Sequence, residues 1–193
     1  AIAEIEDEYH EMMAKADDVP NKGVGVGAMM EWSGCRHGPM DADFDSAVVR
    51  MEEDGTIRIQ SSSADMGTAT RTTLAQVCAE ELGIDVDDIS VIEGDTDSTP
   101  AGMGSWGSRT MAVTGTAVNQ AAQEVRERLL AIAAHNLEAT KEDLEISDGE
   151  IHISGAPERS ISISEIANYA HYDKSKLPPE MSNGALIGKA SFD

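Results

Sequence analysis

The feature that most constrains the fold is a long helical pattern that runs from Thr110 to Ala139. Apolar residues recur there at the spacing that places them on one face of a helix. The first half of this face consists almost entirely of small residues, so another element must pack closely against it. The predicted inward residues are Val113, Ala117, Ala121, Val125, Leu129, Ile132 and Ala133.

Short extended runs lie on both sides of this helix, and two pairs of them are joined by residues that favour hairpin turns. Asp54-Gly55 separates the runs SAVVRM and TIRIQSSS, and Asp148-Gly149 divides DLEISDGEIHIS in the same way. An Asp-Gly pair between two extended runs is a strong local signal for a hairpin. The run DDISVIEG predicts a further short strand between the first hairpin and the long helix.

Two shorter helices complete the predicted set. Leu74, Val77, Cys78 and Leu82 share one helical face, and Gly83 is placed to end that helix. The segment SISISEIANYAHY predicts a strand followed by a helix that Ser164 would cap. The order is β-β-α-β-loop-α-β-β-β-α, which predicts an α+β fold with a mixed sheet and hairpins packed against helices.

The composition indicates a globular protein with few aromatic residues. The chain has 193 residues, of which 40% are hydrophobic and 4% aromatic, so Ala, Val, Ile, Leu and Met must fill the core. Lys and Arg number 14 against 36 Asp and Glu, giving a net charge of −22. This charge argues against nucleic acid or an anionic membrane as a partner. No membrane span or signal peptide is visible in the sequence, and we expect a cytoplasmic location.

The sequence predicts a short N-terminal segment that is separate from the main domain. Residues 1–20 predict a helix and linker, which Pro20 and the following NKG end, and residues 21–193 predict the main domain. Alternating Val and Gly in KGVGVGAMMEWSG suggest a closely packed strand, and CRHGPMDADF reads as a loop. Cys35 and Cys78 are too few for a disulfide framework or a zinc site. Cys78 reads as a small core residue.

Two glycine-rich loops each lead into a helix, and they are the candidate functional elements. The first spans Asp65 to Thr70 and the second spans Ser98 to Arg109. The start of a helix offers unpaired N–H groups, and glycines let the backbone approach an oxygen-rich ligand. Neither loop has the lysine of a P-loop or the G-x-G-x-x-G dinucleotide fingerprint. On chemistry alone, a ligand site and a pair of structural turns both remain open.

The segments SSADMGTATRTTLAQVCAEELGI and ISVIEGDTDSTPAGMGSWGSRT, followed by a small-residue helix and LEISDGEI, resemble the molybdenum hydroxylases. This superfamily contains the large subunits of xanthine dehydrogenase, aldehyde oxidase and aerobic carbon monoxide dehydrogenase. The resemblance runs in order from about Lys22 to Ala170 and covers most of the chain. It implies a domain that binds a molybdopterin dinucleotide cofactor, in the cytosine form that is usual in bacterial relatives.

The resemblance also implies which residues face the cofactor. Thr68 stands where many members have Gln, and Ala69 replaces the last glycine of the family's first motif. In the second loop, Trp106 has an alternative interpretation as an anchor packed in the core. The implied cofactor-binding residues are Gly67, Thr68, Ala69, Thr70, Gly104, Ser105, Trp106, Gly107, Ser108 and Arg109.

Several parts of such an enzyme have no counterpart in this sequence. The superfamily hydroxylates its substrates with water as the oxygen source, assisted by a glutamate general base from a C-terminal glycine-rich motif that is not found here. No catalytic residue is therefore assigned. The iron–sulfur and flavin (FAD) groups are expected on other domains or subunits, together with the remainder of the large subunit. We expect this chain to be one domain of a larger enzyme, excised or naturally split, and inactive alone.

Two other interpretations differ in class. One is a non-catalytic assembly or binding module of the same fold that has lost the cofactor, and the other is an unrelated anion-binding α+β domain. The acidic residues Glu93, Asp95 and Asp97 could suggest a cation site. Sequential acidic residues in a loop more commonly are solvated or cap backbone amides, and we assign no metal to them.

Overall fold

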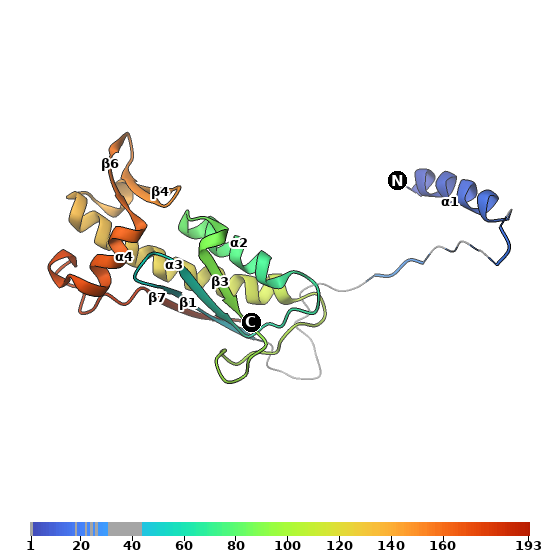
Figure 1. The fold of residues 1–193 in the computed structure, drawn as a ribbon, viewed down its shortest axis with the longest axis horizontal. Coiled ribbons are helices and arrows are strands. Elements are labelled where there is room, and N and C mark those ends of the chain that lie inside the picture. The colour runs from blue at the N-terminus through green and yellow to red at the C-terminus, as the bar shows by residue number, and fades with distance from the viewer. Residues whose placement is uncertain (1, 18, 22, 24, 26, 31–43) are drawn as a thin grey trace. The chain divides into compact units, whose positions relative to one another are not determined.

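The computed structural model describes residues 2–17, 19–21, 23, 25, 27–30 and 44–193. It divides into two units, Ala1–Glu31 and Trp32–Asp193, and each is described by itself. The first unit contains the helix α1, Ile2–Asp17, as the spacing of its apolar residues predicts (Figure 1). Gly23, Gly25 and residues 27–30 belong to no helix or strand, so the strand expected there is not found among the described residues. The segment around Cys35 lies outside them.

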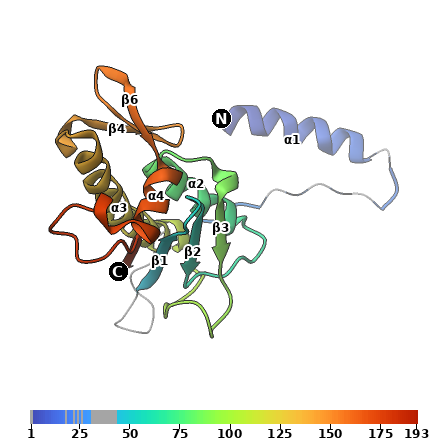
Figure 2. The ribbon, with the colours of Figure 1, turned by 60° about the vertical axis from the view of Figure 1, so that its left-hand side comes forward.

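The second unit has an α+β fold, which confirms the predicted class. Its main sheet has the strand order β3-β2-β1-β7, and a smaller sheet has the order β4-β5-β6. In the main sheet β1 pairs antiparallel with both β2 and β7. Strands β2 and β3 are parallel (Figure 2). The strands are β1 Asp45–Met51, β2 Ile57–Ser61, β3 Ile89–Ile92, β4 Leu144–Ser147, β5 Glu150–Ile153, β6 Ala156–Ser162 and β7 Ile187–Phe192. The helices are α2 Thr70–Leu82, α3 Thr110–Leu137 and α4 Ile163–Tyr172, with short 3-10 turns at Val86–Asp88, Lys141–Asp143 and Lys174–Lys176.

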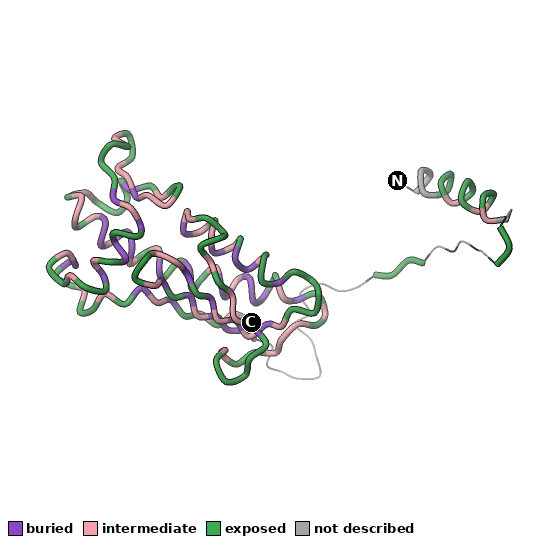
Figure 3. Tube along the Cα trace, viewed as in Figure 1, coloured by how far each residue is buried: buried purple, intermediate pink, exposed green. Residues whose placement is uncertain are grey.

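The long helix α3 packs against the main sheet and organises the core. Its buried residues include the seven inward positions predicted from the sequence. The close approach expected from its small residues is also confirmed, because a Cβ on Gly188 in β7 would overlap the backbone carbonyl of Ala121. Buried stretches therefore follow α3 and the neighbouring strands (Figure 3).

Both predicted hairpins are present. Asp54-Gly55 lies in the connection between β1 and β2, where Met51 pairs with Ile57. Asp148 and Gly149 form the turn between β4 and β5 with φ values of 51° and 74°, the left-handed backbone that an Asp-Gly pair tolerates. The amide of Gly149 donates to the carbonyl of Gly83 at 2.7 Å, so this turn is fixed to the end of α2.

Two details of the sequence interpretation were wrong or incomplete. Ser162, not Ser164, caps α4, because its hydroxyl accepts the amide of Glu165 at 3.2 Å. Ser162 and Glu165 have the S-x-x-E spacing that marks such a cap. The C-terminal strand β7 was not expected at all. It forms the edge of the main sheet through its pairing with β1.

Candidate functional site

The first glycine-rich loop forms a tight turn around a carboxylate. The Oδ1 atom of Asp65 accepts the amides of Gly67 at 2.8 Å and Thr68 at 2.9 Å. Gly67 has φ +94°, and Ala69 is also left-handed at φ 56° where it precedes α2. Gly67 is therefore required for the shape of the turn. Its amide and that of Thr68 already have an acceptor within the chain.

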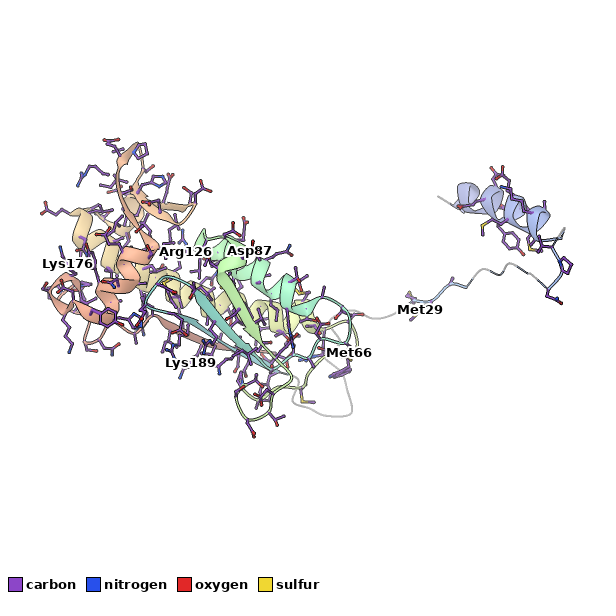
Figure 4. The ribbon with its side chains drawn as sticks, viewed as in Figure 1. Met29, Met66, Asp87, Arg126, Lys176 and Lys189 are labelled. Atoms are coloured by element: carbon purple, nitrogen blue, oxygen red, sulfur yellow. The ribbon has the colours of Figure 1, made fainter. Side chains whose placement is uncertain are left out.

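The two hydroxyls of the first loop differ in exposure, because Thr68 is exposed whereas Thr70 is buried at 3%. Thr68 Oγ1 lies 3.0 Å from Thr70 Oγ1, at the first residue of α2. Apart from Gly67 and its two chain neighbours, no atom of the described residues lies within 4 Å of the position that a Cβ on Gly67 would occupy, so the turn presents an open face. Met66, labelled in Figure 4, is 67% exposed beside it.

The second glycine-rich loop is held from inside by an ion pair. Arg109 and Asp45 are both fully buried, and Nη1 of Arg109 lies 2.6 Å from Oδ2 of Asp45. The same Nη1 donates to the carbonyl of Gly104 at 2.7 Å. Arg109, which the resemblance assigned to the cofactor, thus lies inside the domain, with its guanidinium 5.8 Å from the centroid of the Trp106 ring.

Other parts of the second loop have open or partly exposed faces. Gly104, Gly107 and Ser108 have φ values of 77°, 55° and 52°. In the part of the chain that the structure describes, a Cβ on Gly104 would meet no atom within 4 Å beyond its own chain neighbours. Trp106 is 37% exposed, so the alternative interpretation of this side chain as a loop anchor packed in the core is wrong about its burial.

The two loops meet. Ser105 Oγ accepts the amide of Ala64 at 3.2 Å and donates to the carbonyl of Ala64 at 2.8 Å. The structure therefore brings the segment before Gly67 into direct contact with the second loop. A pocket of about 470 Å³ lies next to this contact and is lined by residues 62–64 and by parts of 94–102.

A buried carboxylate beside the pocket was missed by the sequence interpretation. Glu93 is 7% exposed, which contradicts its expected solvation. Its Oε2 accepts the hydroxyl of Ser63 at 2.8 Å, and its Oε1 lies 3.2 Å from Nε of Arg71, whose side chain is 62% exposed. A charged group this deep in a protein requires such partners. Glu93 therefore fixes the start of the first loop and orients a surface cation at the first turn of α2.

The neighbouring acidic residue behaves as the sequence indicated. Asp95 is exposed and caps its own loop, since it accepts the hydroxyl of Ser98 at 2.7 Å and the amide of Asp97 at 3.0 Å. These hydrogen bonds, that of Ser98 first, lower the pKa of Asp95 below its ordinary value of 3.8. Among the described residues, no group of three or more acidic, His or Cys side chains could hold a metal ion.

The arrangement has the features of a domain that binds a large polar cofactor. Both turns have open glycine faces, and the exposed Thr68 hydroxyl, the partly exposed Trp106 ring and the Arg71 cation lie on or beside them. These groups suit a ligand that combines an aromatic ring system with phosphate oxygens.

The chain belongs to the molybdopterin cofactor-binding domain family, which matches it over residues 3–192. It is 37% identical over 174 residues to the nicotine 6-hydroxylase large subunit of Paenarthrobacter nicotinovorans, covering 87% of this chain and 21% of that protein. It is 37% identical over 141 residues to the carbon monoxide dehydrogenase large chain of Afipia carboxidovorans, covering 73% of this chain and 17% of that protein. The crystal structure of quinoline 2-oxidoreductase from Pseudomonas putida 86 superposes with a TM-score of 0.73 at 34% identity, over 78% of this chain and 19% of that one.

These matches confirm the resemblance to molybdenum hydroxylase large subunits and the α+β fold. The chain spans about a fifth of the length of these relatives. Among the described residues, none of the helices combines the length and the hydropathy that a membrane crossing requires.

Proposed function

We propose that the two glycine-rich loops together bind the molybdopterin dinucleotide cofactor of an oxidoreductase of the molybdenum hydroxylase type. The observation that supports this proposal is the contact of Ser105, in the second loop, with Ala64, directly before the first loop, in a chain of this family. When bound, the cofactor would supply the redox centre for hydroxylation of a substrate with oxygen from water.

The proposed task of this chain is to hold and orient the cofactor. The exposed Thr68 would donate a hydroxyl hydrogen bond to a cofactor oxygen, and the buried Thr70, 3.0 Å away, would orient that hydroxyl. Trp106 would pack against a ring, and the open faces of Gly67 and Gly104 would allow close approach of the backbone. The neighbouring residues Ala69, Gly107 and Ser108 shape the same turns through their left-handed backbone. Arg109 would act indirectly, by fixing the loop from inside.

The remaining expectations extend this proposal to the whole enzyme. Residues 1–20 would form a helix and linker and residues 21–193 the cofactor domain of a large subunit that also contains the substrate pocket. Iron–sulfur and flavin groups would lie on partner domains or subunits, and the cofactor would be the cytosine dinucleotide. The complex would be cytoplasmic, and this chain alone would be inactive, because the glutamate base of the superfamily has no counterpart in it.

One observation favours the second candidate, a non-catalytic module that has lost the cofactor. The amides of Gly67 and Thr68 donate to Asp65, and the Arg109 guanidinium is paired with Asp45, so these donors are engaged within the chain. Molybdenum and pterin analysis of the purified native complex discriminates between the two. A stoichiometric content supports the cofactor domain, and its absence supports the module.

The site itself is tested by Gly67→Val in the assembled enzyme. The φ of +94° at Gly67 disfavours a β-branched residue, so the turn must change shape and cofactor loading should be lost. Gly155→Val is the matched control, since Gly155 also has positive φ (+80°) and open space at its Cβ position but lies between β5 and β6. The control should keep its molybdenum. Equal molybdenum content in the two variants would refute this site.

A further inference from the structure

Asp45 is a buried carboxylate at the first position of β1, and the sequence pattern did not single it out. Both its whole residue and its side chain are 0% exposed. Its Oδ1 faces the middle of the second glycine-rich loop, and its Oδ2 faces the end of the loop and the second turn of α3. The donors are the amides of Met103 at 2.9 Å and Gly104 at 3.3 Å to Oδ1, and Nη1 of Arg109 and Oγ1 of Thr114, each at 2.6 Å, to Oδ2.

These donors span the loop from its middle to the second turn of α3. Met103 and Gly104 precede the exposed Trp106, whereas Arg109 and Thr114 follow it. Residues 105–108 therefore form an excursion whose two flanking segments are both hydrogen-bonded to the Asp45 carboxylate. Because Arg109 Nη1 also donates to the carbonyl of Gly104, the two ends of this segment are joined directly as well.

The second glycine-rich loop packs so closely against Asp45 that Gly102 has no room for a side chain. A Cβ on Gly102 would overlap Ser62 and Oδ1 of Asp45. The loop thus rests on the start of β1 and on the residue that follows β2. A buried charge strongly favours the one arrangement in which its hydrogen bonds are made. Asp45 can therefore select a single conformation of a loop whose glycines would otherwise permit many.

We propose that Asp45 is the positioning residue of the cofactor loop. It holds residues 103–109 in the shape that exposes Trp106 and brings Ser105 to Ala64, and it does so from beneath the binding surface without contact with the cofactor. This inference rests on the proposed function, because the loop conformation that Asp45 holds is the one proposed to bind the cofactor.

The test compares Asp45→Asn with Asp87→Asn in the assembled enzyme. Asp45→Asn keeps the size of the side chain and an acceptor for the amides of Met103 and Gly104, but it removes the negative charge that Arg109 and Thr114 face. Asp87→Asn makes the same chemical change at an exposed position next to β3, labelled in Figure 4. Molybdenum and pterin content and peptide-resolved hydrogen exchange are measured for both.

We expect Asp45→Asn to lose most of its molybdenum and pterin, while exchange in residues 102–109 accelerates by about tenfold or more. Exchange in β4, β5 and α4 should stay at the wild-type rate, which separates positioning of the loop from a general structural role. Asp87→Asn should match the wild type in every measurement. Uniform acceleration throughout the domain, or wild-type cofactor content in Asp45→Asn, would overturn the inference.

Thr114→Val keeps the test decisive if Asp45→Asn does not fold. It removes one of the donors to Oδ2 with little change in shape, so exchange in 102–109 should rise by a smaller factor and cofactor content should fall in parallel. No change in either quantity would overturn the inference. A wild-type enzyme that contains no molybdopterin would refute the proposed function itself, whereas a loaded wild type with an equally loaded Asp45→Asn would refute only the role of Asp45.

Discussion

The hydroxyl of Ser105 bonds to both backbone groups of Ala64, accepting the N–H at 3.2 Å and donating to the C=O at 2.8 Å. These two residues belong to loops that precede different helices, α2 and α3. A single side chain thus ties together the two segments that we propose to share a cofactor. Neither residue lies in a strand, so the two segments are joined by side-chain hydrogen bonds and not by the backbone hydrogen bonds of a sheet.

Ser105→Ala should weaken this tie and lower the free energy of unfolding by about 1–2 kcal/mol, because both backbone groups of the partly buried Ala64 lose their partner. Ser98→Ala is the control, since the Ser98 hydroxyl donates to the carboxylate of the exposed loop residue Asp95 and should contribute a few tenths of that amount. Denaturant unfolding of the two variants measures the difference. Equal values would show that the contact between the loops adds no stability.

Ala69 adopts a left-handed backbone with φ 56° immediately before α2, where its side chain caps nothing. A left-handed alanine is strained by about 1–2 kcal/mol, which exceeds the chain entropy that glycine adds to the unfolded state. Ala69→Gly should therefore stabilise the protein, by up to about 1 kcal/mol. Ala79→Gly, the same exchange inside α2, should destabilise it by about 1 kcal/mol. Thermal unfolding checks the sign, and destabilisation by both variants would contradict the assigned conformation.

Features that depend on residues adjacent in the sequence could be predicted, whereas features that depend on contacts between remote segments could not. The turn at Asp148-Gly149 needs only its own left-handed backbone, and the end of α2 needs only Gly83, so both could be predicted from a few residues. The small-residue face of α3 also predicted a close neighbour correctly. It could not identify that neighbour as β7, whose place depends on pairing with β1, a strand more than a hundred residues earlier in the sequence.

The site was predicted only in part for the same reason. The glycines marked both loops, because positive φ restricts the residue type locally. Asp45 and Glu93 gave no such signal. A carboxylate is expected at the surface, and these two are buried only because Arg109 and Thr114, or Ser63 and Arg71, come to them from other elements.

Gly188 is the point where β7 touches α3, and it tests the close packing of these elements. A Cβ there would overlap the carbonyl of Ala121, a backbone atom that cannot move by a rotamer change. Gly188→Ala should lower the free energy of unfolding by about 3 kcal/mol, the upper range of overpacking. Gly115→Ala, within α3, meets only the flexible end of Met111 at 3.1 Å and should be neutral or stabilising. Urea unfolding of both proteins provides the comparison, and a harmless Gly188→Ala would disprove the contact.

The cap of α4 is tested by two serines two residues apart. Ser162→Ala removes the acceptor of the Glu165 amide and should lower stability by about 1 kcal/mol. Ser164→Ala should have a smaller effect, because that serine lies inside the first turn and does not accept this amide. The helical signal and the melting temperature of the two variants are the measurements. The reverse ranking would restore Ser164 as the cap.

Cys78 predicts a loss of stability at alkaline pH. Burial first, and the nearby charge of Glu81 second, raise the pKa of its thiol from 9.0 to about 12. Between these values the unfolded chain releases a proton that the folded chain keeps, so the unfolded state binds fewer protons and the free energy of unfolding falls as pH rises. The limiting slope from this one group is about 1.4 kcal/mol per pH unit.

The contribution of Cys78 is isolated by comparison with Cys78→Ala. Tyr169 and Tyr172 titrate in the same alkaline range, with pKa values raised by their hydrogen bonds to Glu165 and Glu53, and they are common to both proteins. The wild type should therefore lose more stability than the variant between pH 9 and 11 in denaturant titrations. At pH 8 the folded wild type should also leave Cys78 unmodified by iodoacetamide, whereas the unfolded chain reacts. Parallel stability curves together with rapid alkylation in the folded state would mean that the thiol is accessible to water.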